Sequence, residues 1–176
     1  MQDDSSSPIR TVLHVEPLSA TSFEPFGQVI EASPGMAHHL INDGYAERYH
    51  DLARVDTASA GGRTLVNIFR ARPRTLPLRL SLVECHRLGS QLFLPLSPQR
   101  FIVVVAAAGP TPRPEALRCF LAGAGQGVNL SRGTWHHPLL ALAEGGDFLV
   151  IDRGAPDKTE DCEVHRLDQT EVWIEA

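Results

Sequence analysis

The sequence contains few cysteines, no long hydrophobic run and no excess of positive charge. Its three cysteines, Cys85, Cys119 and Cys162, are widely spaced among 176 residues, so they predict neither a disulfide framework nor a CxxC zinc motif. The longest apolar run, residues 101–109, is far shorter than the ~20 residues that a membrane-spanning helix needs. The formal net charge of −5 gives no general attraction to nucleic acid or to an anionic membrane.

The amino terminus, MQDDSSSPIR, is polar and lacks the layout of a secretion signal. Together with the scarcity of cysteine, this predicts a cytoplasmic protein. We expect residues 1–8 to be a disordered leader and residues 9–176 to form a single domain.

Proline and glycine are frequent, with 13 and 14 copies, and this favours many short elements over a few long helices. A short helical turn is expected within 18–26, where Ser19 is a candidate N-cap. Short alternating or apolar segments separated by turn residues predict an all-β barrel or sandwich. The expected strands are 9–17, 26–32, 63–71, 78–88, 91–96, 101–108, 117–122, one or two within 127–142, 148–152 and 163–167.

The segment 78–88 is the most informative of these strands. Side chains in a strand repeat every two residues, so one face is expected to carry three leucines (78, 80 and 82) followed by Glu84 and His86. A leucine-lined strand that ends in a carboxylate and an imidazole is typical of a small-molecule pocket. A turn at 88–90 would bring Gln91 to the same cavity.

A second cluster lies at 127–138, where Gly133 precedes two adjacent histidines. A glycine at this point lets the backbone turn tightly and aim the following side chain at a pocket. In an extended chain His136 and His137 point to opposite faces, so we expect only one of them to be a ligand.

These two clusters resemble the two metal-binding motifs of the cupin barrel. The matching residues are Glu84-x-His86-x4-Gln91 and, later in the chain, Gly133-x-x-His136. The sequence differs from the usual cupin pattern, since Glu84 stands where a histidine is common and Gln91 where a glutamate is common. A carboxylate and two imidazoles would suit a first-row divalent metal, with Gln91 as a further ligand or a hydrogen-bond donor to substrate.

Blocks of sequence from Leu18 to Trp173 also resemble the ureidoglycolate lyase family. They are NDG (42–44), ERYHDL (47–52), QGVN (126–129), GTWHHPL (133–139) and IDRG (151–154). The resemblance implies a cupin-like double-stranded β-helix barrel with a few short helices, a homodimer, and cleavage of (S)-ureidoglycolate to glyoxylate and urea in allantoin degradation. It also implies a divalent metal, usually nickel, as the cofactor.

Cleavage of ureidoglycolate calls for a base, an acid and an anchor for the substrate carboxylate. Glu84, His86 and His136 are the candidate catalytic residues as metal ligands, and without a metal Glu84 and His86 can serve as base and acid. The candidate carboxylate anchors are three arginines, because a guanidinium can grip a carboxylate with two parallel hydrogen bonds. The full set of predicted substrate-binding residues is Arg48, Arg70, Arg153, Gln91 and Asn129.

His50 is a candidate acid for the leaving nitrogen, and a structural hydrogen bond is an equally good explanation for it. Two other functions stay open on the residues alone. One is a ureidoglycolate amidohydrolase, which releases ammonia in place of urea. The other is a cupin-type module that binds a ligand without catalysis.

Overall fold

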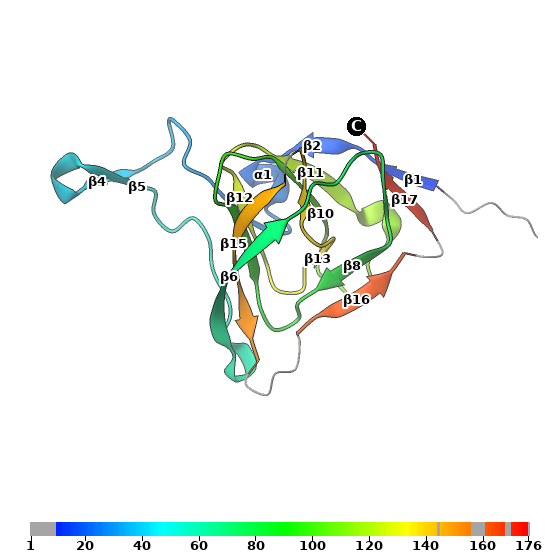
Figure 1. Cartoon of the computed structure of the whole chain (residues 1–176). Helices are drawn as coiled ribbons and strands as arrows, with labels where there is room; N and C mark the ends of the chain where they lie inside the picture. Colours follow the sequence, from blue (N-terminus) through cyan, green and yellow to red (C-terminus); the bar gives the residue numbers. More distant parts are fainter. Residues whose placement is uncertain (1–9, 144, 156–160, 168–169, 176) are drawn as a thin grey trace, which may run out of the picture.

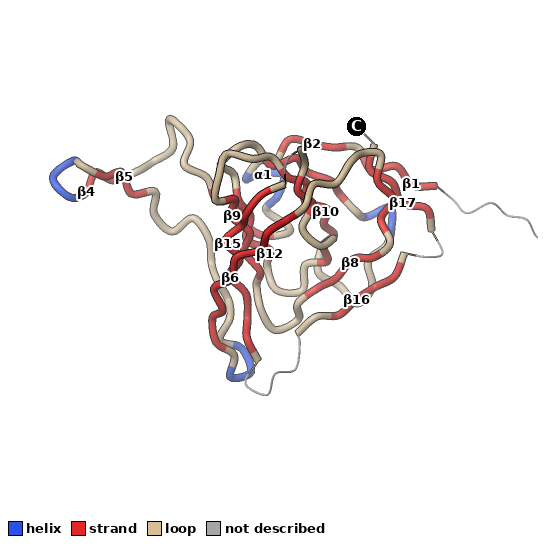
Figure 2. Tube along the Cα trace, viewed as in Figure 1, coloured by secondary structure: helices blue, strands red, loops and turns tan. Residues whose placement is uncertain are grey.

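The computed structural model describes residues 10–143, 145–155, 161–167 and 170–175. β-Strands account for most of its regular structure, and the helices are single turns (Figures 1 and 2). This confirms the predicted all-β class. No helix in these ranges is long and apolar enough to cross a membrane. The expected leader at residues 1–8 lies outside the described residues.

Two larger sheets face each other. The first is five-stranded, in the order β3 (Gly27–Ile30), β12 (Gly127–Leu130), β9 (Gln91–Pro95), β15 (Gly146–Gly154) and β6 (Arg63–Ala71). The second is seven-stranded, in the order β16 (Glu163–Arg166), β8 (Leu82–Cys85), β13 (Trp135–His136), β10 (Phe101–Ala106), β11 (Arg118–Ala122) and β2 (Val15–Pro17), and β14 (Leu140–Ala141) also pairs with β10. This arrangement of facing sheets is consistent with the cupin-like fold that the resemblance implies.

Two smaller sheets complete the structure. A three-stranded sheet has the order β1 (Arg10–Leu13), β17 (Glu171–Ile174) and β7 (Leu78–Leu80). A two-stranded hairpin is made of β4 (His39–Ile41) and β5 (Ala46–Arg48). The helical turns are α1 (Ala20–Phe23) and the 3-10 turns η1 (Asn42–Gly44), η2 (Ser59–Gly61) and η3 (Pro114–Ala116).

The core is divided into two parts by the seven-stranded sheet. Strand β10 is buried along its whole length because it contributes alternate residues to both parts. Phe101, Val103 and Val105 face the five-stranded sheet and form the inner core. Ile102 and Val104 face the three-stranded sheet and form the outer core. The continuous apolar run that predicted a buried strand is thus explained by two covered faces.

Several elements agree closely with the sequence-based expectations. The predicted strand 63–71 has the same bounds as β6. The predicted helical turn is α1, and Ser19 caps it, since the Ser19 side chain accepts a hydrogen bond from the Ser22 amide. The structure adds β4, β5 and β17, which the sequence analysis did not predict.

The segment 78–88 differs from the prediction. It forms two strands, β7 and β8, interrupted at Ser81, and these belong to different sheets. Leu80 therefore faces the outer core, together with Val83, whereas Glu84 lies on the opposite face of β8. The expectation that the leucines at 78 and 80 share a face with Glu84 is wrong, because the break at Ser81 shifts the alternation by one residue.

Candidate functional site

Three predicted ligand residues converge on the inner side of the seven-stranded sheet. Glu84 on β8 and His136 on β13 are direct cross-strand neighbours, and His86 follows β8 by one residue. One ligand atom from each of Glu84, His86 and His136 lies within 4.8 Å of the others. The prediction that these three side chains meet is borne out by their geometry.

Local backbone structure explains why β13 lies beside β8. Gly133 has a φ of +80°, the left-handed region that glycine adopts without strain. Its amide donates a 2.7 Å hydrogen bond to the His86 carbonyl, which ties the turn to the end of β8. His136 then points inward beside Val105. His137 instead places its Nδ1 2.8 Å from the Pro138 carbonyl, and burial lowers its pKa. Only the first of the two histidines joins the cluster, as predicted.

Main-chain carbonyls orient both imidazoles of the cluster. His86 Nδ1 donates to the carbonyl of Asp161, and His136 Nδ1 donates to the carbonyl of Thr134 at 3.0 Å. A carbonyl oxygen only accepts, so each Nδ1 carries a hydrogen, and in the neutral form of each ring the lone pair lies at Nε2. The Nε2 atom of His86 is buried and has no hydrogen-bond partner in the described part of the chain.

Gln91 adds a fourth acceptor to the cluster. Its side chain is buried at the start of β9, and its Oε1 lies 3.1 Å from His136 Nε2. The Gln91 side chain lies close enough to the Asp152 carboxylate to act on its pKa, and an amide nitrogen turned toward Asp152 leaves the amide oxygen facing the histidine. Asp152 also accepts a 3.0 Å hydrogen bond from Asn67. Asp152 is therefore a positioning residue for Gln91.

The protonation of the two acidic side chains follows from these contacts. Burial alone would raise the pKa of Glu84, but the contact with His136 and the positive charges that His136 and His86 carry when protonated outweigh it, and the pKa is lowered. Glu84 Oε1 lies 3.5 Å from His136 Nε2. Burial raises the pKa of Asp152, against the effect of its hydrogen bonds from Gln91 and Asn67.

The donor set fits a divalent metal ion. Lone pairs are available at Glu84 Oε1, His86 Nε2, His136 Nε2 and Gln91 Oε1, and a cation held by Glu84, His86 and His136 would lie beside the Gln91 oxygen, which is 3.1 Å from His136 Nε2. The buried His86 Nε2 without a partner is the observation that argues most directly for such an ion. Imidazole nitrogens with carboxylate and amide oxygens suit first-row metals such as nickel, manganese and zinc.

A cavity of about 440 Å³ opens beside the cluster, between the two larger sheets. His86, Asp152 and Cys162 are part of its wall, and two arginines, Arg63 and Arg153, also line it. The Arg153 guanidinium donates to the carbonyls of Ser59 and Ala60. The Arg63 guanidinium makes no hydrogen bond or ion pair with the described residues, which leaves it available to an anionic ligand.

The other predicted site residues lie away from this cavity. Arg70 is exposed and makes a two-pronged ion pair with Asp147 on the outside of the sheet. Asn129 is buried on the face of β12 opposite the inner core, where it donates to Gln28 and to the Arg54 carbonyl. Arg48 lies on the projecting β4–β5 hairpin.

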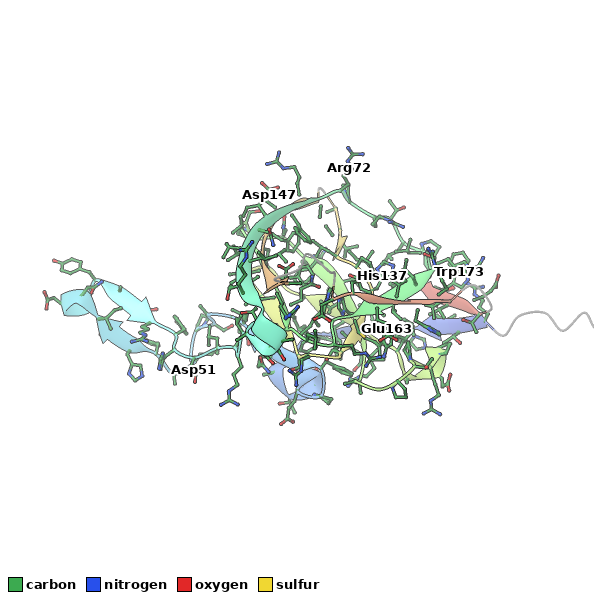
Figure 3. All side chains as sticks on the ribbon, turned by 90° about the horizontal axis from the view of Figure 1, so that it is seen from below. Asp51, Arg72, His137, Asp147, Glu163 and Trp173 are labelled. Carbon is green, nitrogen blue, oxygen red and sulfur yellow. The ribbon has the colours of Figure 1, made fainter. Side chains whose placement is uncertain are left out.

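His50 lies two residues beyond the end of this hairpin. Figure 3 shows the neighbouring Asp51 at the root of the hairpin, whereas His137 lies within the body. The structure of one chain thus brings together Glu84, His86, Gln91 and His136, with Arg153 in the cavity wall.

Sequence reasoning missed Arg63 and Asp152. Both lie in segments that were predicted as strands, and Asp152 belongs to the IDRG block. A signal was available, since alternation along β15 places Asp152 on the same face as the buried Phe148 and Val150. A carboxylate at the end of an apolar face marks a candidate site.

Comparison with known proteins is consistent with this site. The ureidoglycolate lyase family pattern matches residues 10–175. A ureidoglycolate lyase of Burkholderia cepacia is 51% identical over 146 residues, which cover 82% of this chain and 81% of the relative. That of Azotobacter vinelandii is 46% identical over 163 residues, or 93% and 96% of the two chains. Another from Pseudomonas aeruginosa (strain UCBPP-PA14) is 43% identical over 162 residues, or 92% and 94%. Because the family pattern spans nearly the whole chain and these relatives match most of it, the protein belongs to the ureidoglycolate lyase family.

Proposed function

We propose that this protein is a ureidoglycolate lyase that cleaves (S)-ureidoglycolate to glyoxylate and urea in allantoin degradation. The observation that carries the proposal is the convergence of Glu84, His86, His136 and Gln91 beside a cavity. A cavity of about 440 Å³ is large enough for so small a substrate. Family membership supports the same substrate.

The reaction breaks one carbon–nitrogen bond without adding water. The substrate hydroxyl loses its proton, the carbon–oxygen bond becomes the aldehyde of glyoxylate, and the departing urea nitrogen gains a proton. One proton is therefore moved from oxygen to nitrogen, with no net uptake or release. A single group that lies near both atoms can carry it.

Glu84, His86 and His136 would hold a divalent metal, with the Gln91 amide oxygen as a fourth ligand. When bound, such an ion lowers the pKa of a coordinated hydroxyl and stabilises negative charge on its oxygen. Nickel is the candidate that the family resemblance suggests.

The chain's own groups account for the remaining steps. Glu84 Oε2 accepts a hydrogen bond from Cys162, a residue of the cavity wall, at 3.6 Å. We assign to this oxygen the proton that leaves the hydroxyl and returns to the urea nitrogen. Arg63 binds the substrate carboxylate from the opposite wall, because its guanidinium has no partner among the described residues. Asp152 keeps the Gln91 oxygen turned toward the cluster.

The test is product analysis with both enantiomers of ureidoglycolate, with heat-denatured protein as the control for spontaneous decay. Glyoxylate and urea in equal amounts from the (S) enantiomer are expected. Ammonia without urea would instead identify an amidohydrolase, and no glyoxylate from either enantiomer would leave only ligand binding. Glu84→Gln should lower kcat by about 10²–10⁴-fold, whereas Glu24→Gln, on the exposed end of α1, should have no effect.

Metal dependence needs a separate measurement. Protein treated with a chelator should lose activity and regain it on addition of Ni²⁺ or Mn²⁺. Full activity with far less than one metal ion per chain would contradict the assigned ligands. We also propose, on the family resemblance, that the protein is a homodimer.

A further inference from the structure

The outer face of the five-stranded sheet is unusually apolar. Alternate residues of three neighbouring strands, β6, β15 and β9, form two cross-strand rows on this face, which we call the aliphatic face. The rows are Ile68–Leu149–Leu94 and Val66–Ile151–Leu92. An antiparallel sheet that faces water normally carries polar residues on its outer side. This face therefore has the composition of a covered surface.

The described part of the chain covers this face only in part, since Leu92 is buried and Leu94, Leu149 and Ile151 are half-buried, whereas Val66 and Ile68 are exposed. The seven-stranded sheet has its outer face buried by the three-stranded sheet, which forms the outer core. The five-stranded sheet has no corresponding layer among the described residues, and Val66 and Ile68 are 69% and 56% exposed. The segment 54–57 crosses near one end, where its backbone bonds to Asn129 and Ser90.

A second apolar surface projects from the body. Residues 39–48, which we call the arm, form the β4–η1–β5 hairpin, and Figures 1 and 3 both show it extending away from the sheets. Leu40 and Tyr45 on the arm are 65% and 92% exposed. A two-stranded hairpin is at best marginally stable alone in water. The arm therefore needs a surface on which to pack.

We propose that the arm of one copy packs on the aliphatic face of a second copy, and that the second copy's arm does the same in return. One chain supplies one arm and one face, so a twofold dimer covers both surfaces without a third partner. The arm follows β3, an edge strand of the same sheet, so its root lies beside the sheet that carries the face. The net charge of −5 argues against an anionic membrane as the occupant.

The test compares three variants of the full chain by sedimentation velocity. The arm variant carries Leu40→Asp and Tyr45→Asp, and the face variant carries Val66→Asp and Ile68→Asp. The control is Val164→Asp, which is 49% exposed on β16 and outside both surfaces. The unaltered protein and the control should be dimers, and the dimer dissociation constant of each other variant should rise about 100-fold or more, because each contact occurs twice.

Mixing the arm variant with the face variant tests the pairing itself. The arm variant keeps an intact face and the face variant keeps an intact arm, so a mixed dimer regains one of its two contacts. Its dissociation constant should fall clearly below that of either variant alone. A face-to-face or arm-to-arm interface predicts no such recovery, and that result would overturn the proposal.

Two further results would also overturn it. One is a monomeric unaltered protein at about 100 µM, where a dimer of micromolar affinity is fully formed. The other is a dimer that survives both pairs of substitutions. If circular dichroism shows that the aspartates unfold β6, Val66→Thr and Ile68→Thr keep the strand propensity while removing apolar surface, and the same weakening is expected.

Discussion

Replacing Asp152 with asparagine should weaken metal binding, although Asp152 is not itself an assigned ligand. The carboxylate accepts a hydrogen bond from Asn67, and it also lies close enough to the Gln91 amide for that side chain to act on its pKa. Asparagine has a single acceptor oxygen for these two donors, so its own NH₂ group must face one of them. If that donor is Gln91, its amide turns over and the Oε1 atom leaves the cluster.

The expected loss of metal affinity follows from the role of Asp152, which orients the metal ligand Gln91. Loss of a group that orients a metal ligand typically costs about 10- to 100-fold in metal affinity or activity. This corresponds to about 1.4–2.8 kcal/mol. The assay is calorimetric titration of chelator-treated protein with Ni²⁺, together with kcat and KM. Asp147→Asn is the matched control, because Asp147 lies on the same strand but pairs with Arg70 outside the cavity.

A compensating substitution makes the test specific. The double variant combines Asn67→Asp with Asp152→Asn, which exchanges the two side chains between the strands. The carboxylate introduced at position 67 then accepts from the amide introduced at position 152, and the amide oxygen at position 152 is again free to accept from Gln91. Metal affinity should recover to within several-fold of the original value. If Asp152→Asn alone binds metal normally, or if the double variant is no better than the single one, Asp152 does not position Gln91.

Three further outcomes are expected. Arg63→Ala should raise KM by about 10- to 100-fold with little change in kcat, whereas Arg70→Ala should leave both constants unchanged. An unaltered KM for Arg63→Ala would show that Arg63 does not bind the substrate carboxylate. Burial raises the pKa of the Cys85 thiol to about 11 and that of Cys119 to about 12, so neither should react with iodoacetamide at pH 8 until the protein is unfolded, as followed by mass spectrometry. A hydrogen bond from Arg118 lowers the pKa of Glu16. The contact therefore stabilises the fold above the unfolded pKa near 4.5, and this stabilisation is lost as the pH falls through the lower pKa of the folded state. Glu16→Gln should accordingly lower the Tm at pH 7 and have a smaller effect at pH 3, and an equal effect at both would contradict this account.

The fold class and the cluster were predictable from local pattern. Strand alternation aimed Glu84 and His86 at one side, and the glycine turn aimed His136. These features depend on neighbours in the sequence, which is why sequence reasoning recovers them. The cluster forms because β8 and β13 pair directly, and the resemblance to cupins anticipated that long-range contact.

Other features depend on contacts that no local pattern encodes. The break at Ser81 puts Leu80 in a different sheet from Glu84, and nothing in the alternating segment marks the change. Asn129 lies in a block that resembles the family, yet its side chain points to the outer face of its sheet. The choice among arginines was equally hidden, because Arg70 has a carboxylate partner far along the chain whereas Arg63 has none among the described residues.

The two cluster histidines, His86 and His136, are oriented by main-chain carbonyls, which limits how mutation can alter this site. Since the carbonyls of Asp161 and Thr134 belong to the backbone, no single replacement at those positions deletes the acceptor. The tautomer of each imidazole is thus robust to mutation of its partner. The orientation of Gln91 is sensitive to mutation, because it depends on one side chain, that of Asp152. Engineering of metal preference should begin at positions 91 and 152, where the coordination sphere is adjustable.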